Sequence, residues 1–270
     1  MKNLGLTTCA LLISMLAIPW AGAEGNKVQK PNEKTYDETY VTGEHQIHLV
    51  ELFSSEGCSS CPPAESWVAS LKGHPALWQK FVPIEFHVDY WNQLGWVDPF
   101  SNGLFTKRQR EYASEWGTYR IYTPGFAFNG AEWRGLQTFN VKVTQKSPDG
   151  KPGRLKVIRK KELEFEVRFA AHGDKKEDYI LHGVVLGNGL ETKVPAGENE
   201  GRTLKHEFVV LTMEKVVLKR KGQEWVGNLT LPSPENSRAR SYSVAFWARK
   251  PDSMKPIQAV GGPIAYRPTP

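Results

Sequence analysis

Two cysteines, Cys58 and Cys61, stand two residues apart in the stretch "LVELFSSEGCSSCPPAESW", residues 49–67. A pair at this spacing can switch between dithiol and disulfide, can supply two ligands of a metal site, or can form a structural disulfide. A disulfide that closes so short a loop removes little entropy from the unfolded chain, which argues against a purely structural role. A redox pair and half of a metal site therefore remain.

The surroundings of the pair favour redox chemistry. Residues 47–53 form an apolar run typical of a strand, and residues 64–71 place apolar side chains at helical spacing. The pair thus lies at a helix N-terminus, where the helix dipole and free N–H groups stabilise a thiolate. We expect Cys58 to be the exposed, attacking thiol and Cys61 the resolving thiol. Two prolines follow directly, so the helix either begins at them or has a distorted start.

The segments that follow continue the alternation of strand and helix. Residues 81–90 read as a second buried strand, and residues 104–116 read as a helix. Residues 125–135 follow as a hairpin that turns at Asn129–Gly130. Thr123 and Pro124 stand just before this hairpin.

Over residues 45–147 this order resembles the thioredoxin superfamily, an α/β fold in which a cis-proline loop lies beside the cysteine pair. The resemblance implies a cis peptide before Pro124 and a substrate-holding role for Thr123 and Pro124; an ordinary trans-proline entering an edge strand is the alternative. It also implies that an acidic residue in the first strand relays a proton. Glu51 is the nearest match, but its loop to Cys58 is one residue longer, and a strand-edge carboxylate facing solvent is the alternative.

A narrower resemblance covers nearly the whole chain after residue 44. It is carried by the stretches "VELFSSEGCSSCPPAE", "HVDYWNQLGWVDPF", "YTPGFAFNG" and "GENEGRTLKHEFVV". These are similar to a family of secreted bacterial thioredoxin-like proteins known only as domain of unknown function number 1223. That family implies no established substrate.

Aromatic residues follow the second strand, at the carboxyl edge where open α/β sheets bind ligands. Tyr90, Trp91 and Trp96 could frame a substrate groove there, or could seal a junction with a second domain. His87 and Asp89 could tune the nucleophile, although a buried structural hydrogen bond is the more ordinary role for each.

The second half of the chain, residues 148–270, has a different texture. Residues 162–169 alternate strictly between polar and apolar, and short strand-like runs at 178–185, 206–213, 224–231 and 241–249 are separated by turn residues. We predict an all-β sandwich of six or seven strands without a helix longer than about two turns.

The N-terminus reads as an export signal. Lys2 precedes an apolar run over residues 4–20 and a small-residue cleavage site ending at Ala23, so residues 1–23 are expected to be a signal peptide. The run is too short for the ~20 residues that span a bilayer. A polar, flexible leader over residues 24–44 would follow. These features predict a secreted, periplasmic protein.

Charge and composition restrict the classes of partner that the protein is expected to bind. The formal net charge is +6, and the basic runs alternate with apolar residues as solvated strand faces do, which argues against nucleic-acid binding. We expect a thiol–disulfide oxidoreductase acting on protein or small-molecule thiols, with no cofactor because the cysteines carry both electrons. The alternatives are a copper or zinc carrier that uses the cysteine pair and a redox-inactive interaction protein. The sequence does not indicate the oligomeric state.

Overall fold

The computed structural model describes Met1 and residues 36–135, 150–172, 178–235 and 237–268. All its helices and strands lie in one compact unit, Thr35–Pro270. The predicted signal peptide and most of the predicted leader lie outside the described residues, as does the predicted domain boundary at residues 147 and 148. The last part of the leader contains strand β1 (Thr39–Val41), which pairs with β6 (Gly153–Arg159).

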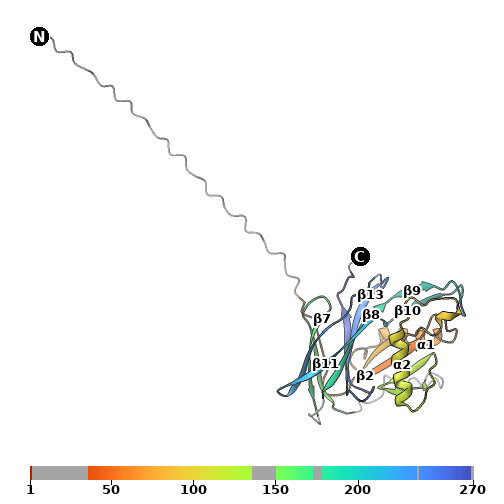
Figure 1. The fold of residues 1–270 in the computed structure, drawn as a ribbon, viewed down its shortest axis with the longest axis horizontal. Helices are drawn as coiled ribbons and strands as arrows, with labels where there is room; N and C mark the ends of the chain where they lie inside the picture. The colour runs from red at the N-terminus through yellow and green to blue at the C-terminus, as the bar shows by residue number, and fades with distance from the viewer. Residues whose placement is uncertain (2–35, 136–149, 173–177, 236, 269–270) are drawn as a thin grey trace. The chain divides into compact units, whose positions relative to one another are not determined.

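The first half of the chain contains the described helices and five short strands. These are β1, β2 (His48–Ser54), α1 (Pro62–Ser70), the 3₁₀ turn η1 (Leu71–Gly73), β3 (Phe81–His87), the 3₁₀ turn η2 (Asn92–Leu94), α2 (Gly103–Glu115), β4 (Gly125–Phe128) and β5 (Ala131–Glu132). Figure 1 shows α1 and α2 close to β2. No described helix is long and apolar enough to cross a membrane.

The described part of the second half contains strands only. They are β6, β7 (Glu164–Ala171), β8 (Tyr179–Asn188), β9 (Leu190–Lys193), β10 (Thr203–His206), β11 (Val209–Lys221), β12 (Glu224–Thr230), β13 (Ser241–Arg249) and β14 (Pro256–Ile264). The expectation of no long helix here is therefore confirmed for the described residues. Strict alternation in β7 buries Phe165, Val167 and Phe169 on one face, as its period of two requires.

The predicted fold class, a thioredoxin-like α/β domain followed by a separate β-sandwich, is wrong. Twelve strands form one mixed sheet that runs from the first half into the second. The join is a parallel contact between β3 and β11, where Val209 pairs with Glu85 and the Glu85 N–H donates to the Phe208 carbonyl at 2.9 Å. The long strand β11 also pairs with β8 and, at its other end, with β12.

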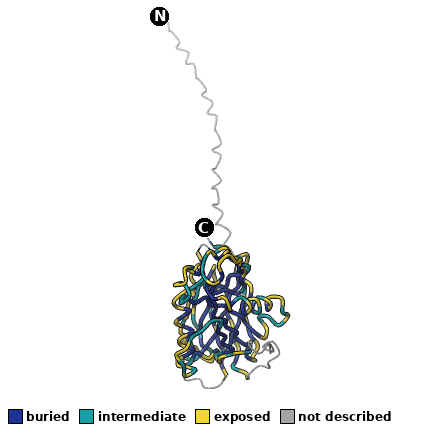
Figure 2. Tube along the Cα trace, turned by 90° about the vertical axis from the view of Figure 1, so that its right-hand side faces the viewer, coloured by how far each residue is buried: buried dark blue, intermediate teal, exposed yellow. Residues whose placement is uncertain are grey.

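The hydrophobic core shows the same continuity. One cluster combines residues of β2, β3 and α2 with residues of β8, β11 and β13: Leu49, Leu52, Ile84, Phe105, Val184, Leu186, Val210, Ala245 and Trp247. Figure 2 shows buried residues throughout the interior of the folded body. Sequence periodicity identified these elements but not the pairing, because a strand buried on both faces does not reveal its neighbours.

Trp247 on β13 tests whether both halves unfold together. Its side chain is fully buried, and the Arg108 guanidinium of α2 lies over its ring at 4.8 Å. We expect Trp247→Ala to lower the free energy of unfolding by about 3–5 kcal/mol, the usual cost of emptying a core tryptophan site. The urea transition should remain single, with coincident midpoints by tryptophan fluorescence and far-ultraviolet circular dichroism.

Tyr119→Ala is the matched control, because that ring is 96% exposed. It should change the free energy of unfolding by less than about 0.5 kcal/mol. Two separated transitions, in either the wild-type protein or Trp247→Ala, would contradict a shared core.

Candidate functional site

The cysteine pair lies in a tight turn between β2 and α1. The Cys58 N–H donates to the Ser55 carbonyl at 3.1 Å, and the Cys61 N–H donates to the Cys58 carbonyl at 3.2 Å. Helix α1 begins directly at Pro62, so the two prolines occupy its first two positions. A missing N–H is tolerated there because the first N–H groups of a helix have no partner within the helix. Of the two alternatives for the prolines, the helix therefore begins at them.

Both cysteines are free thiols, and both are buried. Cys58 is 1% exposed and Cys61 is fully buried, so the expectation of an exposed Cys58 is wrong. The exposed part of the turn is the pair of serines between them. Gly57 permits close cover of the turn, because a Cβ added at Gly57 would lie 2.9 Å from the Cβ of Trp91.

Side chains from the second half of the chain hydrogen-bond the backbone of the cysteine turn. The Asn199 side-chain amide, in the connection between β9 and β10, donates to the carbonyls of Glu56 at 2.8 Å and Cys58 at 2.9 Å. The neighbouring Glu198 carboxylate accepts from the Ser59 N–H at 2.9 Å. These contacts fix the backbone on both sides of Cys58.

The two thiols are electrostatically unequal. Hydrogen bonds from the Cys61 thiol and from the Ser60 and Thr123 hydroxyls outweigh burial and lower the pKa of Cys58 to about 6. Burial, together with the hydrogen bond to Cys58 and the negative charge there, raises the pKa of Cys61 well above its usual range. Near neutral pH, Cys58 is therefore the thiolate and Cys61 the thiol.

Three of the predicted substrate-side residues gather beside Cys58. Thr123 shares a hydrogen bond with Cys58, and its Oγ1 accepts from the Trp91 Nε1–H at 2.8 Å. Tyr90 also hydrogen-bonds Thr123, and its hydroxyl donates to Gln109 at 3.2 Å. The Thr123–Pro124 peptide is cis, which confirms that expectation.

Glu51 and Trp96, two further predicted site residues, form their hydrogen bonds with residues other than Cys58 and Thr123. The Glu51 carboxylate is fully buried, so it is not a solvent-facing strand-edge group, and it accepts from Arg108 at 2.8 Å and from the Tyr112 hydroxyl. None of its described hydrogen bonds reaches a cysteine. The Trp96 indole donates to the Glu56 carboxylate at 2.7 Å.

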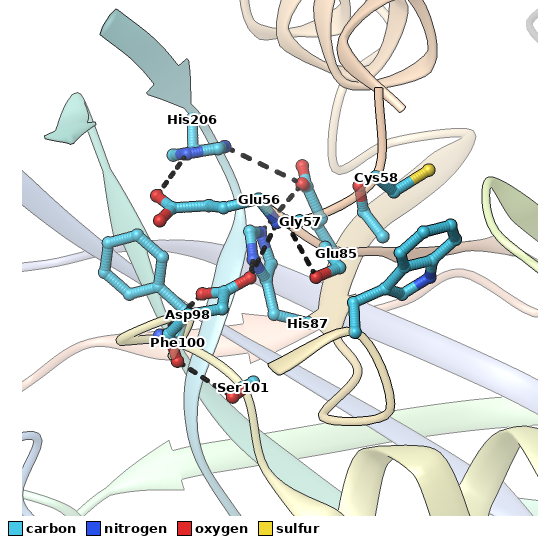
Figure 3. Close-up of polar contacts among 12 residues, drawn as sticks. Glu56, Gly57, Cys58, Glu85, His87, Asp98, Phe100, Ser101 and His206 are labelled. Carbon is cyan, nitrogen blue, oxygen red and sulfur yellow. Dashed lines mark hydrogen bonds and ion pairs between the residues drawn. The ribbon is translucent and has the colours of Figure 1, made fainter. Parts of the chain in front are cut away.

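A buried group of acids and histidines lies on the other side of the turn from the Cys58 sulfur, which points away from it (Figure 3). His87 Nδ1 bonds the Asp98 carboxylate at 2.6 Å, and His87 Nε2 bonds Glu85 at 3.0 Å. His206 Nε2 bonds Glu56 at 3.1 Å. His87 thus has the buried structural contacts considered for it, and Asp89 likewise accepts from the Thr106 hydroxyl.

Burial and ion pairing shift the pKa values of the carboxyl and imidazole groups in this cluster. Burial raises the pKa of Glu85. Burial alone would lower the pKa of each histidine, but Asp98 and Glu85 hold the pKa of His87 well above its usual value. Hydrogen bonds to Glu56 and Glu65 likewise raise the pKa of His206 to about 9.

With this geometry established, comparison with known proteins places the chain in a family. The sequence model described as "Protein of unknown function (DUF1223)" matches residues 49–248. The chain belongs to this family. No curated protein is significantly similar to this DUF1223 chain.

Two solved structures share the fold of this DUF1223 protein. Protein AGR_C_4864 from Agrobacterium tumefaciens is 18% identical, with a TM-score of 0.57 over 81% of this chain and 95% of that one. HBP35 of Porphyromonas gingivalis is 15% identical, with a TM-score of 0.62 over 84% of this chain and 78% of that one. At such identities the likeness concerns the fold alone.

Sequence reasoning about this DUF1223 chain did not identify several residues of the site, namely Glu56, Glu65, Glu85, Asp98, Asn199 and His206. One signal was available, because Glu85 and His87 share one face of an apolar strand and a charge in such a strand needs a buried partner. Asn199 lies 141 residues from its partner Cys58, and only the fold brings them together.

Ser60 provides a test of the thiolate at Cys58. Its hydroxyl lies 3.3 Å from the Cys58 sulfur. Because one such bond contributes about 1 kcal/mol and 1.36 kcal/mol corresponds to one pKa unit, we expect Ser60→Ala to raise the pKa of Cys58 by roughly 0.5–1 unit. The measurement is the pH profile of iodoacetamide labelling at Cys58, followed by peptide mass spectrometry. Its wild-type midpoint should lie near pH 6.

Ser59→Ala is the control, because the Ser59 hydroxyl bonds Glu198 instead of the sulfur. This variant should keep the wild-type midpoint. Equal midpoints for both serine variants, or a wild-type midpoint near the ordinary thiol value of about 8.5, would contradict the stabilised thiolate.

Proposed function

We propose that this protein is an exported thiol–disulfide oxidoreductase that uses Cys58 and Cys61 on protein or small-molecule thiols. The observation that carries the proposal is the asymmetric pair, a thiolate hydrogen-bonded to a neighbouring thiol in a turn fixed from both sides. A thiolate is the attacking species in disulfide exchange, and a second thiol within reach releases the product.

In the reducing direction, the Cys58 thiolate attacks one sulfur of a substrate disulfide. A bond forms between Cys58 and that sulfur, the substrate S–S bond breaks, and the other substrate sulfur leaves as a thiolate that takes up a proton. Cys61 then loses its proton and attacks the Cys58 sulfur, which releases the second substrate thiolate. Two electrons pass from the protein dithiol to the substrate, and the reverse sequence oxidises a substrate dithiol.

The surroundings of the pair fit a substrate that binds across Tyr90, Trp91 and Thr123. These three side chains are half-buried and linked by hydrogen bonds to one another or to Cys58. Half-buried aromatic rings offer apolar contact to a peptide or small thiol, with a hydroxyl beside the reacting sulfur. Trp96 is not one of these substrate-contacting residues, because its indole N–H donates to the Glu56 carboxylate.

Metal transport by the cysteines is the less favoured alternative. Apart from the cysteines themselves, the side chains that hydrogen-bond the two sulfurs are the hydroxyls of Ser60 and Thr123 at Cys58 and of Ser54 at Cys61. None of them is an imidazole or a carboxylate, and Glu65 acts on Cys61 through its charge without a hydrogen bond. The redox-inactive interaction protein is an outcome of the test below.

We expect Cys61→Ser to accumulate a mixed disulfide at Cys58 when the purified protein is incubated with glutathione disulfide, because no resolving thiol remains. The adduct should approach one glutathione per chain by intact mass spectrometry. The wild-type protein should instead resolve its adduct and form the Cys58–Cys61 disulfide.

Cys58→Ser is the matched variant. Its remaining thiol has a raised pKa and stays protonated near neutral pH, so it should form at least about 10-fold less adduct in the same time. Preferential trapping in Cys58→Ser would reverse the roles of the two thiols. No adduct in either variant would leave the interaction protein as the better function.

A further inference from the structure

The buried group behind the cysteine turn has the composition of a metal site. Glu65 of α1, Glu85 and His87 of β3, and His206 of β10 each offer one ligand atom, and these four atoms lie within 4.8 Å of one another. All four side chains are buried. In Figure 3, His87 and His206 both lie beside Glu85, to which each forms an ion-pair contact.

Both histidines are oriented as metal-ligating histidines are. Asp98 accepts from His87 Nδ1 and Glu56 accepts from His206 Nε2, so a carboxylate holds the outer nitrogen of each ring. The other nitrogen of each ring therefore faces the glutamates. A carboxylate on the outer nitrogen fixes the tautomer and raises the basicity of the ligating nitrogen in known metal sites.

One inner atom lacks a hydrogen bond, and a second has only a long ion-pair contact. Glu85 Oε2 is fully buried and has no hydrogen-bond partner among the described residues, while His206 Nδ1 faces Glu65 Oε2 at 3.4 Å. A buried polar atom without a partner costs about 1–3 kcal/mol, so the fold does not leave such atoms in place without a reason. A cation between the four side chains would bind the imidazole nitrogen and give the glutamate an additional interaction.

The spacing fits a tetrahedral ion. Ligand atoms about 2.0–2.1 Å from zinc lie about 3.3 Å from one another in a tetrahedron. Here His87 Nε2 lies 3.0 Å from Glu85 Oε1, and His206 Nδ1 lies 3.4 Å from Glu65 Oε2 and 4.0 Å from Glu85 Oε1. The wider pairs, up to 4.8 Å apart, would have to close by as much as about 1.5 Å around the ion.

We propose that Glu65, Glu85, His87 and His206 bind one divalent transition-metal ion, with zinc as the preferred ion. Two imidazoles and two carboxylates suit zinc, and two carboxylates balance its charge. The site is closed, since all four ligands are buried, so its role is structural. The ion would tie α1 and β3 to β10 beneath the cysteine turn. Neither cysteine takes part.

The test uses the purified full chain after dialysis against a chelator. We expect it to bind one zinc ion per chain by elemental analysis and to bind Co²⁺ with visible bands typical of tetrahedral nitrogen and oxygen ligation. The sulfur-to-cobalt charge-transfer band should be absent. Magnesium and calcium should not compete, and the double variant Cys58→Ser, Cys61→Ser should bind identically.

Glu85→Gln keeps the size of the side chain but removes one anionic ligand, so it should weaken zinc binding at least about 100-fold while circular dichroism stays native. Glu56→Gln, which acts through His206, should weaken binding by about 10–100-fold. Glu198→Gln, an exposed carboxylate on the outer side of the turn, should have no effect.

Three results would overturn the metal site. The first is less than about 0.1 zinc per folded chain. The second is binding that disappears only in the double cysteine variant, which would assign the ion to the cysteines. The third is wild-type affinity in Glu85→Gln, which would show that the group is a network of ion pairs.

Discussion

The pairing of β3 with β11 is the constraint on which the rest of the structure depends. It joins the first half of the chain to the second in one sheet. It also brings the β9–β10 segment over the cysteine turn, where Asn199 holds the Cys58 carbonyl and His206 reaches Glu56. The cysteine pair is carried by the first half, but its backbone contacts and its buried surroundings are completed by the second.

This arrangement separates two kinds of polar chemistry across one turn. On one side, uncharged donors, namely the Cys61 thiol and the Ser60 and Thr123 hydroxyls, stabilise the Cys58 thiolate. On the other side, carboxylates and imidazoles form a closed group. For the proposed redox function, uncharged donors are suitable because conversion of the thiolate to a neutral disulfide sulfur leaves no unpaired ionic partner among them.

The sequence predicts local structure well, because local structure depends on neighbouring residues. The strand–cysteine turn–helix unit, the hairpin turn at Asn129–Gly130 and the alternating strand β7 all follow from periodicity and turn chemistry. Thr123, Trp91 and Tyr90 are linked by hydrogen bonds near Cys58, but a substrate-binding role for them stays a prediction.

What the sequence did not reveal depends on contacts between distant segments. The division into two separate folds failed because neither β3 nor β11 carries a signal of its partner. Trp91 packs closely against Gly57 of the cysteine turn, and the Glu51 carboxylate pairs with Arg108, 57 residues away on α2. Each of these is fixed by tertiary packing, which local patterns do not encode.

The reduction potential of the Cys58–Cys61 pair tests the redox function most directly. The purified full chain would be equilibrated with glutathione buffers, and free thiols would be counted by mass after alkylation. We predict a reversible two-electron equilibrium with one disulfide per chain, at a potential above about −300 mV, because a stabilised thiolate favours the reduced form. A pair that forms no disulfide, or a potential below about −300 mV as in structural disulfides of secreted proteins, would contradict a redox function.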